Sequence, residues 1–568
     1  MTASEGIIRV ASSERPVTSS SQENATVAHL CFVLCLLLAS LPVLVVETPP
    51  LFDYANHLAR VHVIGNYESS SVFPAHFEVT SFLIPNVLAD VVLLLMMPVM
   101  GILAAGKALL LLTFALTLGG AYALNRVLTG HYSIWPLFAA TLLYHEMFFW
   151  GFLNYDLGLA LLLCGLAAWF HLENQSRGLQ LAVGTLLALL IFLAHLVSFG
   201  LYGFAIAAIE LHRVGRSLRR DGVNRQTLSR GALRLALSAA QFLPALVIFF
   251  ALSPSSGLDP VPRFDFSLFG KAMPFTRVLS SGNPPLDFLT LGLVGGFILL
   301  ALVSRRVSCH GILLTIAGIY FLLVMSLPYT LLGSFFLDSR IVIAVALILV
   351  ASLRPADPEK HNPPLNAKGL GRVAAILLVG IVGIRSVGLI SDWREQERHY
   401  DLVLTALNKV PPGSVIITAV GHPFELGDWF ATRYIKPAHE HTTLYATIHR
   451  NALVPNIFAR RGQNPLVFSS SLKEFNQVSF NPVPRIYTPQ DARWLVNQAR
   501  PVAEKRDTIT PPIPGVFIIG YHIPCDRWPQ DQPLREVHCH QTFSLIELEY
   551  DQAPTTQSLS RQSPEMQP

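Results

Sequence analysis

Charged side chains are scarce in this sequence. Asp, Glu, Lys and Arg make up 14% of the 568 residues, whereas about 25% is usual for soluble domains. The deficit is concentrated in the first 390 residues, where long apolar runs recur. A water-soluble fold could not bury all of these runs. The sequence therefore predicts a polytopic membrane protein and excludes a wholly soluble one.

Two other features are missing. No soluble segment carries a basic face with interleaved aromatic residues, so we expect no nucleic-acid partner despite the net charge of +4. The first apolar run also lacks the basic segment and the small-residue cleavage motif of a secretory signal peptide. We expect residues 28–46 to be a membrane anchor and residues 1–27 to be a disordered cytoplasmic tail.

The apolar runs predict an all-α membrane bundle over residues 28–390, with about eleven spans. The runs lie at 28–46, 83–125, 134–150, 157–170, 180–194, 197–211, 235–252, 288–304, 311–328, 341–353 and 371–390. Several are shorter than the ~20 residues that a straight span needs. The run 83–125 is long enough for two spans, and whether it holds one or two stays open.

Basic residues indicate the orientation of the bundle. They collect in the loops 211–234, 304–310 and 353–372, and the first of these holds seven arginines. Short loops rich in Lys and Arg remain in the cytoplasm. The alternating loops then lie outside, beginning with a first outer loop at 47–82 and including all residues after 391.

The composition changes after residue 390. Short β-like runs at 414–420, 515–523 and 543–550, with a helical pattern at 490–499, predict an extracytoplasmic α/β or α+β domain over 391–551. Residues 552–568 have a disordered composition. Cys525 and Cys539 fall in this exported domain, where an oxidising compartment favours a disulfide. Free thiols, or a zinc site with the neighbouring histidines, remain alternatives.

The stretch LFDYANHLARVHVI, residues 51–64, places titratable groups at the rim of the first span. On a helix from Asp53 to about Tyr67, Asp53, His57 and Arg60 share one face. A carboxylate there could take a proton from an attacking hydroxyl, while the cations hold a lipid phosphate. The alternative is that Asp53 only caps the helix and the other two are ordinary interfacial residues.

This architecture resembles the GT-C superfamily of membrane glycosyltransferases. Asp53 in PPLFDYANHLAR matches the essential acid of their first outer loop, and YHEMFFWGFLNYDLGLA (144–160) is similar to their second acidic loop, with Glu146 and Asp156 as candidates. VPPGSVIITA (410–419) resembles the first strand of their bacterial C-terminal tail. The resemblance implies a donor sugar linked to polyprenyl phosphate. No acidic pair and no WWDYG-type signature occurs, which leaves metal dependence open and argues against transfer of whole oligosaccharides.

Other outer-loop residues are candidates for binding the substrate. Lys271 and Arg277 lie in the long loop 252–287, and Arg340 follows Asp338 at the rim of a later span. Each could meet a donor phosphate, or remain an interfacial residue or an ion pair. His195 joins two apolar runs and could line a cavity, whereas Asp90 should face protein or water because lipid burial is costly. We expect His439 and His441 on a solvated strand edge, without metal.

The sequence thus supports one main hypothesis. A glycosyltransferase in the cytoplasmic (inner) membrane would use Asp53 as general base, and substrate contacts would come from His57, Arg60, Glu146, Asp156, Lys271, Arg277 and Arg340. Its partners would be a polyprenyl-phosphate-linked sugar, a glycan, lipid or protein acceptor, and membrane lipids. No cofactor is certain, and a divalent cation stays open. A transporter or flippase, a polymerase or ligase of lipid-linked glycans, and an inactive assembly protein are the alternatives.

Overall fold

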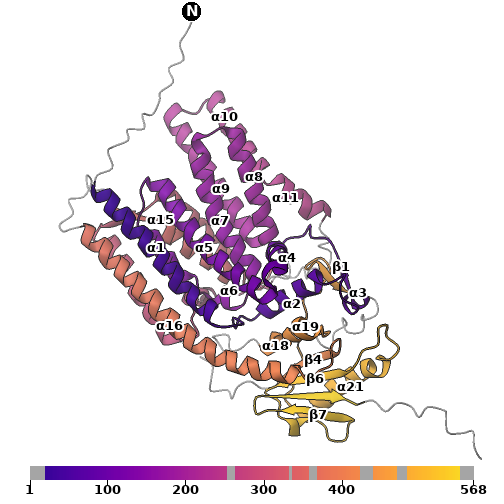
Figure 1. The fold of residues 1–568 in the computed structure, drawn as a ribbon. Helices are drawn as coiled ribbons and strands as arrows, with labels where there is room; N and C mark the ends of the chain where they lie inside the picture. Colours follow the sequence, from indigo (N-terminus) through magenta and orange to yellow (C-terminus); the bar gives the residue numbers. More distant parts are fainter. Residues whose placement is uncertain are drawn as a thin grey trace, which may run out of the picture.

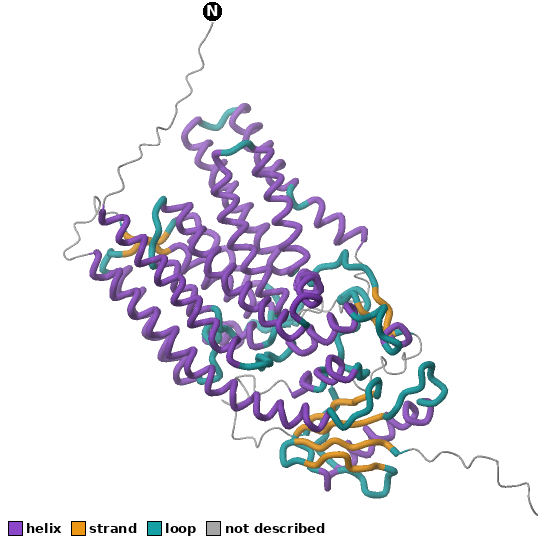
Figure 2. Tube along the Cα trace, in the orientation of Figure 1, coloured by secondary structure: helices purple, strands orange, loops and turns teal. Residues whose placement is uncertain are grey.

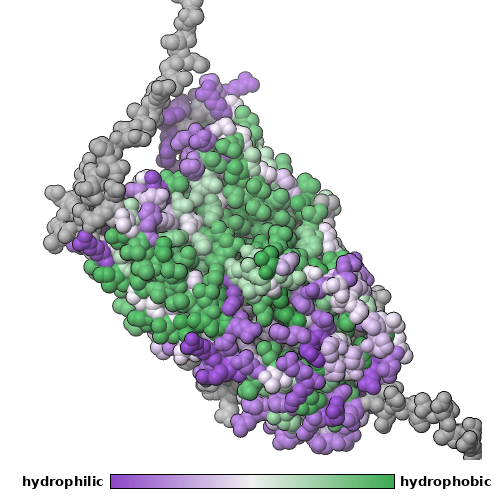
Figure 3. Space-filling view, viewed as in Figure 1, coloured by the Kyte–Doolittle hydropathy of each residue, from purple (hydrophilic) through white to green (hydrophobic). Residues whose placement is uncertain are grey.

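The computed structural model describes residues 19–252, 263–331, 335–356, 367–421, 439–469 and 483–549. Long helices form a bundle, and a small sheet-containing domain covers one end of it (Figure 1). The longest helix, α16 (Ala367–Leu407), runs along the bundle and continues into that domain. The bundle surface in view is largely hydrophobic, whereas the domain and the opposite end are hydrophilic (Figure 3). The chain is a multi-pass membrane protein.

The bundle combines long and short helices. The long ones are α1 (Ser19–Val45), α5 (Ile102–Thr129), α7 (Leu153–His171), α8 (Arg177–Ala194), α9 (Leu196–Asp221), α10 (Arg225–Ala240), α13 (Pro284–Val303) and α16. The shorter ones are α4 (Leu88–Met100), η2 (Leu172–Asn174), α11 (Leu243–Val247), the π-helical turn η3 (Ile248–Leu252), α14 (Gly311–Ser326) and α15 (Leu337–Ser352). Within the described residues, seven helices are long and apolar enough to cross a membrane, or eight if the bent pair α10 and α11–η3 is one span.

Two predicted spans take a different form. Gly101, with φ 77° and ψ 160°, breaks the run 83–125 into α4 and α5, of which only α5 reaches spanning length. The expectation of a helical span at 134–150 is wrong. That segment forms the 3₁₀ helix η1 (Trp135–Leu142) and the one-turn α6 (Glu146–Phe149). Every residue of η1 is buried against other helices, so its apolar character reflects packing inside the protein. The count of about eleven spans stays a prediction.

The predicted basic loops lie together at one end of the bundle, which we call the arginine-rich end (loops 211–234, 304–310 and 353–356). There β2 (Val307–Cys309) pairs antiparallel with β3 (Leu353–Pro355). Burial lowers the pKa of His310, and the nearby charges of Arg354 and Arg216 lower it further. The three loops are therefore neighbours. Figure 2 shows the short sheet and the α9–α10 turn at the end of the bundle opposite the C-terminal domain.

The C-terminal domain is built on a four-stranded sheet in the order β4–β6–β8–β7. The strands are β4 (Val415–Val420), β6 (Val516–Tyr521), β7 (Leu534–Cys539) and β8 (Phe543–Leu548). β4 and β6 are parallel, and the other pairs are antiparallel. All residues of β4 and β6 are buried, which explains why their continuous apolar runs predicted strands at 414–420 and 515–523. The predicted strand at 543–550 corresponds to β8.

Other elements complete the domain. Helix α21 (Pro489–Lys505) contains the predicted helix 490–499 and begins with a capping box between Thr488 and Asp491. η6 (Cys525–Arg527) precedes β7, a half-exposed strand that the sequence did not reveal. Cys525 and Cys539 form a disulfide with Cα atoms 5.9 Å apart.

The first loop of the chain and the C-terminal domain pack together at the end that we call the domain end. β1 (Phe77–Val79) pairs antiparallel with β5 (Leu466–Phe468), and α2 (Tyr54–Gly65) contacts α19 (Tyr445–Arg450). α3 (Phe73–His76) precedes β1, and α12 (Leu268–Thr276) lies in the loop after η3. The predicted strand around His439 and His441 is wrong, because these residues begin the short helix α18 (His439–Thr442).

Candidate functional site

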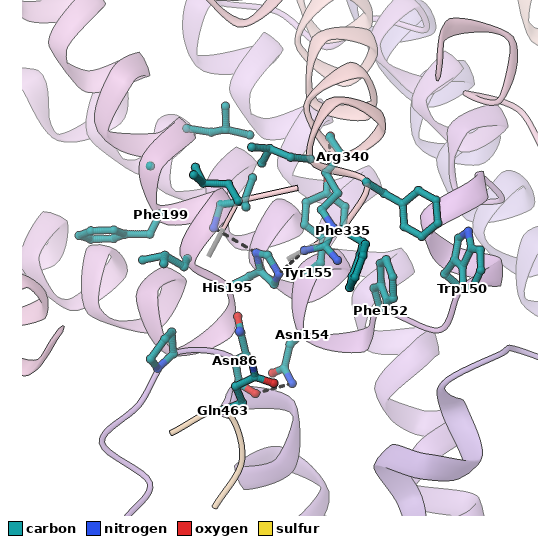
Figure 4. Close-up of a pocket in the computed structure, with 18 of the residues that line it drawn as sticks. Asn86, Trp150, Phe152, Asn154, Tyr155, His195, Phe199, Phe335, Arg340 and Gln463 are labelled. Atoms are coloured by element: carbon teal, nitrogen blue, oxygen red, sulfur yellow. Dashed lines mark hydrogen bonds between the residues drawn. The ribbon is translucent and has the colours of Figure 1, made fainter. Parts of the chain in front are cut away.

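A cavity of about 790 Å³ lies where the bundle meets the C-terminal domain. One part of its lining carries charged, imidazole and carboxamide side chains, namely Asp53, His57, Arg60, Asn86, Asn154, His195, Arg340, Gln463 and Asn464. The other part is apolar and comes largely from α9, η3, α14 and the start of α15. Figure 4 shows Arg340 and His195 pointing toward each other, with Asn86, Asn154 and Gln463 grouped beside them.

Asp53 lies at the polar end, directly before α2. It occupies the N-cap position, but its side chain makes no capping hydrogen bond. Its Oδ1 instead lies 3.2 Å from Nδ1 of His441. The backbone N–H of Asp53 donates to the carbonyl oxygen of Trp150 at 3.0 Å. The carboxylate therefore does not cap the helix, and it lies in contact with a side chain from the C-terminal domain.

Gly151 allows the second outer loop to lie directly against the backbone of Asp53. Its φ is +73°, and a Cβ atom built there would lie 2.8 Å from the backbone nitrogen of Asp53. Only glycine fits both the backbone conformation and the space. The turn Trp150–Gly151 is thus pressed against the backbone that carries the candidate base.

Arg60 lies on the predicted face of α2 but is not a free cation. Its Nε and Nη2 donate to the two carboxylate oxygens of Asp90 at 3.0 and 2.7 Å, and its Nη1 donates to Asn464 at 2.9 Å. Arg60 is 1% exposed and Asp90 is completely buried. The carboxylate offsets the guanidinium charge. The geometry therefore does not favour Arg60 as the principal phosphate ligand, and Asp90 faces protein as expected.

His57 completes this cluster. Its Nδ1 lies 3.0 Å from Nη2 of Arg60. A guanidinium only donates, so Nδ1 must accept and any proton on the neutral ring is on Nε2. Burial lowers the pKa of His57, although Asp90 opposes this shift. His57 thus reaches the cavity as a neutral imidazole.

Arg340 is the second arginine of the lining and lies in the first turn of α15. It is buried, and its guanidinium stacks over the ring of Phe152 at 4.4 Å. Its Nη1 lies 2.9 Å from Nε2 of His195. Nδ1 of His195 accepts from the backbone N–H of Val197 at 3.1 Å. A neutral imidazole has only one acceptor nitrogen, so the arginine and the backbone compete for it.

Four predicted substrate-binding residues do not line the cavity. Arg277 donates to Glu146 at 2.6 Å, and burial raises the pKa of Glu146 against the effect of Arg277. Asp156 lies 3.6 Å from Nε2 of His145.

Lys271 donates to the carbonyl oxygen of Leu327 at 2.9 Å and lies 3.8 Å from Asp338. The sequence left open an ion pair between Arg340 and Asp338. In the structure Asp338 pairs with Lys271 instead. These four predicted substrate-binding residues are not part of the cavity lining, and their contact with a substrate remains a prediction.

The sequence missed the residues that the C-terminal domain contributes. Phe458, Gly462, Gln463 and Asn464 line the cavity, and His441 contacts Asp53. The sequence drew attention to His441 only as part of a histidine pair on a solvated edge, and no local pattern indicated the other four residues. Within the described residues, one group of side chains has metal-ligand spacing, Cys525, Glu536 and Cys539, and its two sulfurs are joined in the disulfide.

Comparison with known proteins gives a likeness in fold. No family model and no curated protein sequence matches the chain. Two crystal structures of ArnT from Cupriavidus metallidurans resemble it, the apo state with a TM-score of 0.47 and the undecaprenyl phosphate complex with 0.49. Both are 11% identical, and each match covers 93% of this chain and 98% of that chain. ArnT is a GT-C glycosyltransferase, the superfamily that the sequence resembles. At such scores the likeness carries no argument about the reaction of this chain.

Proposed function

We propose that the chain is a membrane glycosyltransferase that moves a sugar from a polyprenyl-phosphate donor to a glycan, lipid or protein acceptor. The observation that carries this proposal is the two-part cavity. Its polar end combines the carboxylate of Asp53 with the buried guanidinium of Arg340, and its other wall is apolar. A substrate that fits both parts has a polar head and a long hydrocarbon tail.

The apolar wall suits a lipid tail. Phe204 on α9 and Phe335 line the cavity and are 49% and 51% exposed. This bare aromatic surface is available to a hydrocarbon tail, and burial of each CH₂ group of the tail contributes ~0.8 kcal/mol.

The polar end supplies groups for direct displacement. Asp53 accepts the proton of the acceptor hydroxyl as the oxygen attacks the sugar carbon. The bond between that carbon and the phosphate oxygen breaks, and its electron pair leaves on the phosphate. Arg340 and the N–H of His195 donate to the phosphate as charge grows on it. A bound phosphate would also accept from Arg340, so that His195 would need to accept only from the backbone N–H of Val197. The configuration at the sugar carbon is inverted.

The positions of the arginine-rich loops indicate on which side of the membrane the site lies. The arginine-rich loops lie at the end opposite the cavity. With those loops in the cytoplasm, the cavity and the C-terminal domain face outward from the cytoplasmic (inner) membrane. The acceptor would then approach from the extracytoplasmic side, between the cavity and the domain.

Radiolabelled polyprenyl-phosphate sugars, offered to purified protein with membrane acceptors, test the proposal. We expect Asp53→Asn to fold normally and to lose about 10²–10⁴-fold in kcat, the range that general base catalysis supplies. Glu68→Gln is the matched control, because Glu68 is an exposed acid of the same loop, and it should turn over like the wild type.

Two outcomes would contradict this mechanism. Wild-type turnover by Asp53→Asn removes the carboxylate from the reaction. If Arg340→Ala is inactive while Asp53→Asn is active, a polymerase or ligase chemistry based on arginine is favoured instead. Movement of the lipid-linked sugar across vesicles without transfer would favour the flippase alternative.

A further inference from the structure

In the described part of the C-terminal domain, His441 contacts the side chain of Asp53. His441, in α18, has its Nδ1 3.2 Å from Oδ1 of Asp53 and 3.1 Å from the carbonyl oxygen of Phe52. Both neighbours of this nitrogen are acceptors. Nδ1 therefore carries a hydrogen and donates it to the carbonyl oxygen of Phe52, while the carboxylate of Asp53 lies against the same nitrogen. The tautomer of His441 is set by these contacts.

The ring of His441 packs against two aromatic rings. It contacts the ring of Phe52 with centroids 5.0 Å apart and the ring of Phe458 with centroids 5.5 Å apart. The residue is buried. Phe458 belongs to the same segment that lines the cavity, and its backbone N–H donates to Asn56 of α2 at 2.6 Å. The domain thus presents His441 at a fixed position relative to α2.

The direction of Asp53 has no other side-chain support of this kind on its own helix. Its carboxylate makes no capping hydrogen bond to the first turn of α2. A carboxylate that precedes a helix usually turns back toward the free N–H groups of that turn. Here the carboxylate lies against His441 instead, and Asp53 lines the cavity.

We infer that His441 is a positioning residue for Asp53, so that the C-terminal domain completes the reaction centre. This inference rests on the proposed function and adds a residue to it. The contact with His441 holds one carboxylate oxygen, and the other oxygen remains available to the acceptor hydroxyl. The domain then contributes to the chemical step itself and not only to binding of the acceptor.

Kinetics of two substitutions test the inference. We expect His441→Ala to lower kcat about 10- to 100-fold, less than the loss of the base itself, while KM changes less than about twofold. His441→Asn keeps an N–H donor at a similar distance from the backbone and should recover much of kcat. His449→Ala is the matched control, because His449 is an exposed histidine of the neighbouring helix.

Thermal unfolding supplies a second readout that does not need activity. Asp53→Ala and His441→Ala remove the two sides of one contact, so their losses in Tm should add up to more than the loss in the double variant. Additive losses would overturn the contact. Wild-type kcat in His441→Ala, or a failure that appears only as a raised KM and is not rescued by His441→Asn, would overturn the positioning role. A wild-type protein that transfers no sugar would instead overturn the proposed function.

Discussion

At the scale of residues, the main finding is how the two arginines of the cavity differ. Both are buried and both face the same polar end. Arg60 is bonded through two nitrogens to Asp90, whereas Arg340 stacks on Phe152 and meets a neutral histidine. The first arrangement holds α2 against α4. The second places a buried guanidinium on the lining of the cavity, where an anionic head would bind.

The pair of Arg60 and Asp90 provides a stability test. Asp90→Leu alone leaves a buried guanidinium without its carboxylate, so we expect a loss of about 3–5 kcal/mol in unfolding free energy. Arg60→Met with Asp90→Leu removes both charges and should recover most of that loss. Thermal unfolding in detergent measures both variants. Equal destabilisation of the single and double variants would show that the charge pairing is not what matters here.

At the scale of elements, a glycine turn determines where the candidate base can lie. Gly151 and Gly130 both have positive φ, +73° and +82°. A Cβ atom at Gly151 would meet the backbone of Asp53 and Tyr54, whereas one at Gly130 would meet nothing within 4 Å. Both positions require a positive φ, and only Gly151 also lies against the backbone at the start of α2.

This contrast predicts different effects of the same substitution. Gly130→Ala and Gly151→Ala should each cost about 1–3 kcal/mol in stability, because both force alanine into a disfavoured conformation. Only Gly151→Ala should also lower kcat, because it displaces the backbone of Asp53. Parallel measurement of Tm and of sugar transfer distinguishes the effects. An unchanged kcat in Gly151→Ala would mean that this turn tolerates displacement.

At the scale of the whole molecule, the first outer loop and the C-terminal domain form one structural unit. Asn56 is completely buried, and its amide donates to the carbonyl oxygen of Asn456 at 2.9 Å while accepting from the N–H of Phe458. β1 and β5 add a second connection. These contacts hold the segment that carries Phe458, Gln463 and Asn464 over the cavity.

Asn56→Ala should therefore loosen the domain over the cavity. The lost side chain removes a hydrogen bond from each of two backbone groups, which costs about 1–3 kcal/mol. We expect faster amide hydrogen exchange across residues 456–464, with the helices of the bundle unchanged. Asn408→Ala is the matched control, since Asn408 is exposed. Unchanged exchange at 456–464 would show that β1 and β5 alone hold the domain in place.

Part of this architecture could be predicted from the sequence because it depends on local pattern. The runs that became α1, α7 and α8, and the buried strands β4 and β6, follow from hydrophobic length and continuity. The prediction of a span at 134–150 was wrong because an apolar segment buried in protein has the same composition as one buried in lipid. The strand around His441 was wrong because a few residues without periodicity do not determine an element.

The sequence by itself determined that this is a membrane bundle with an arginine-rich end, and that a helix begins next to Asp53 at the other end. These properties depend on solvent preference and on spacing within one segment. Only the tertiary structure decided that Asp90 offsets the charge of Arg60, that Arg340 faces the cavity and that His441 holds Asp53. Those contacts join segments far apart in the chain, and their geometry depends on how the whole bundle and domain pack.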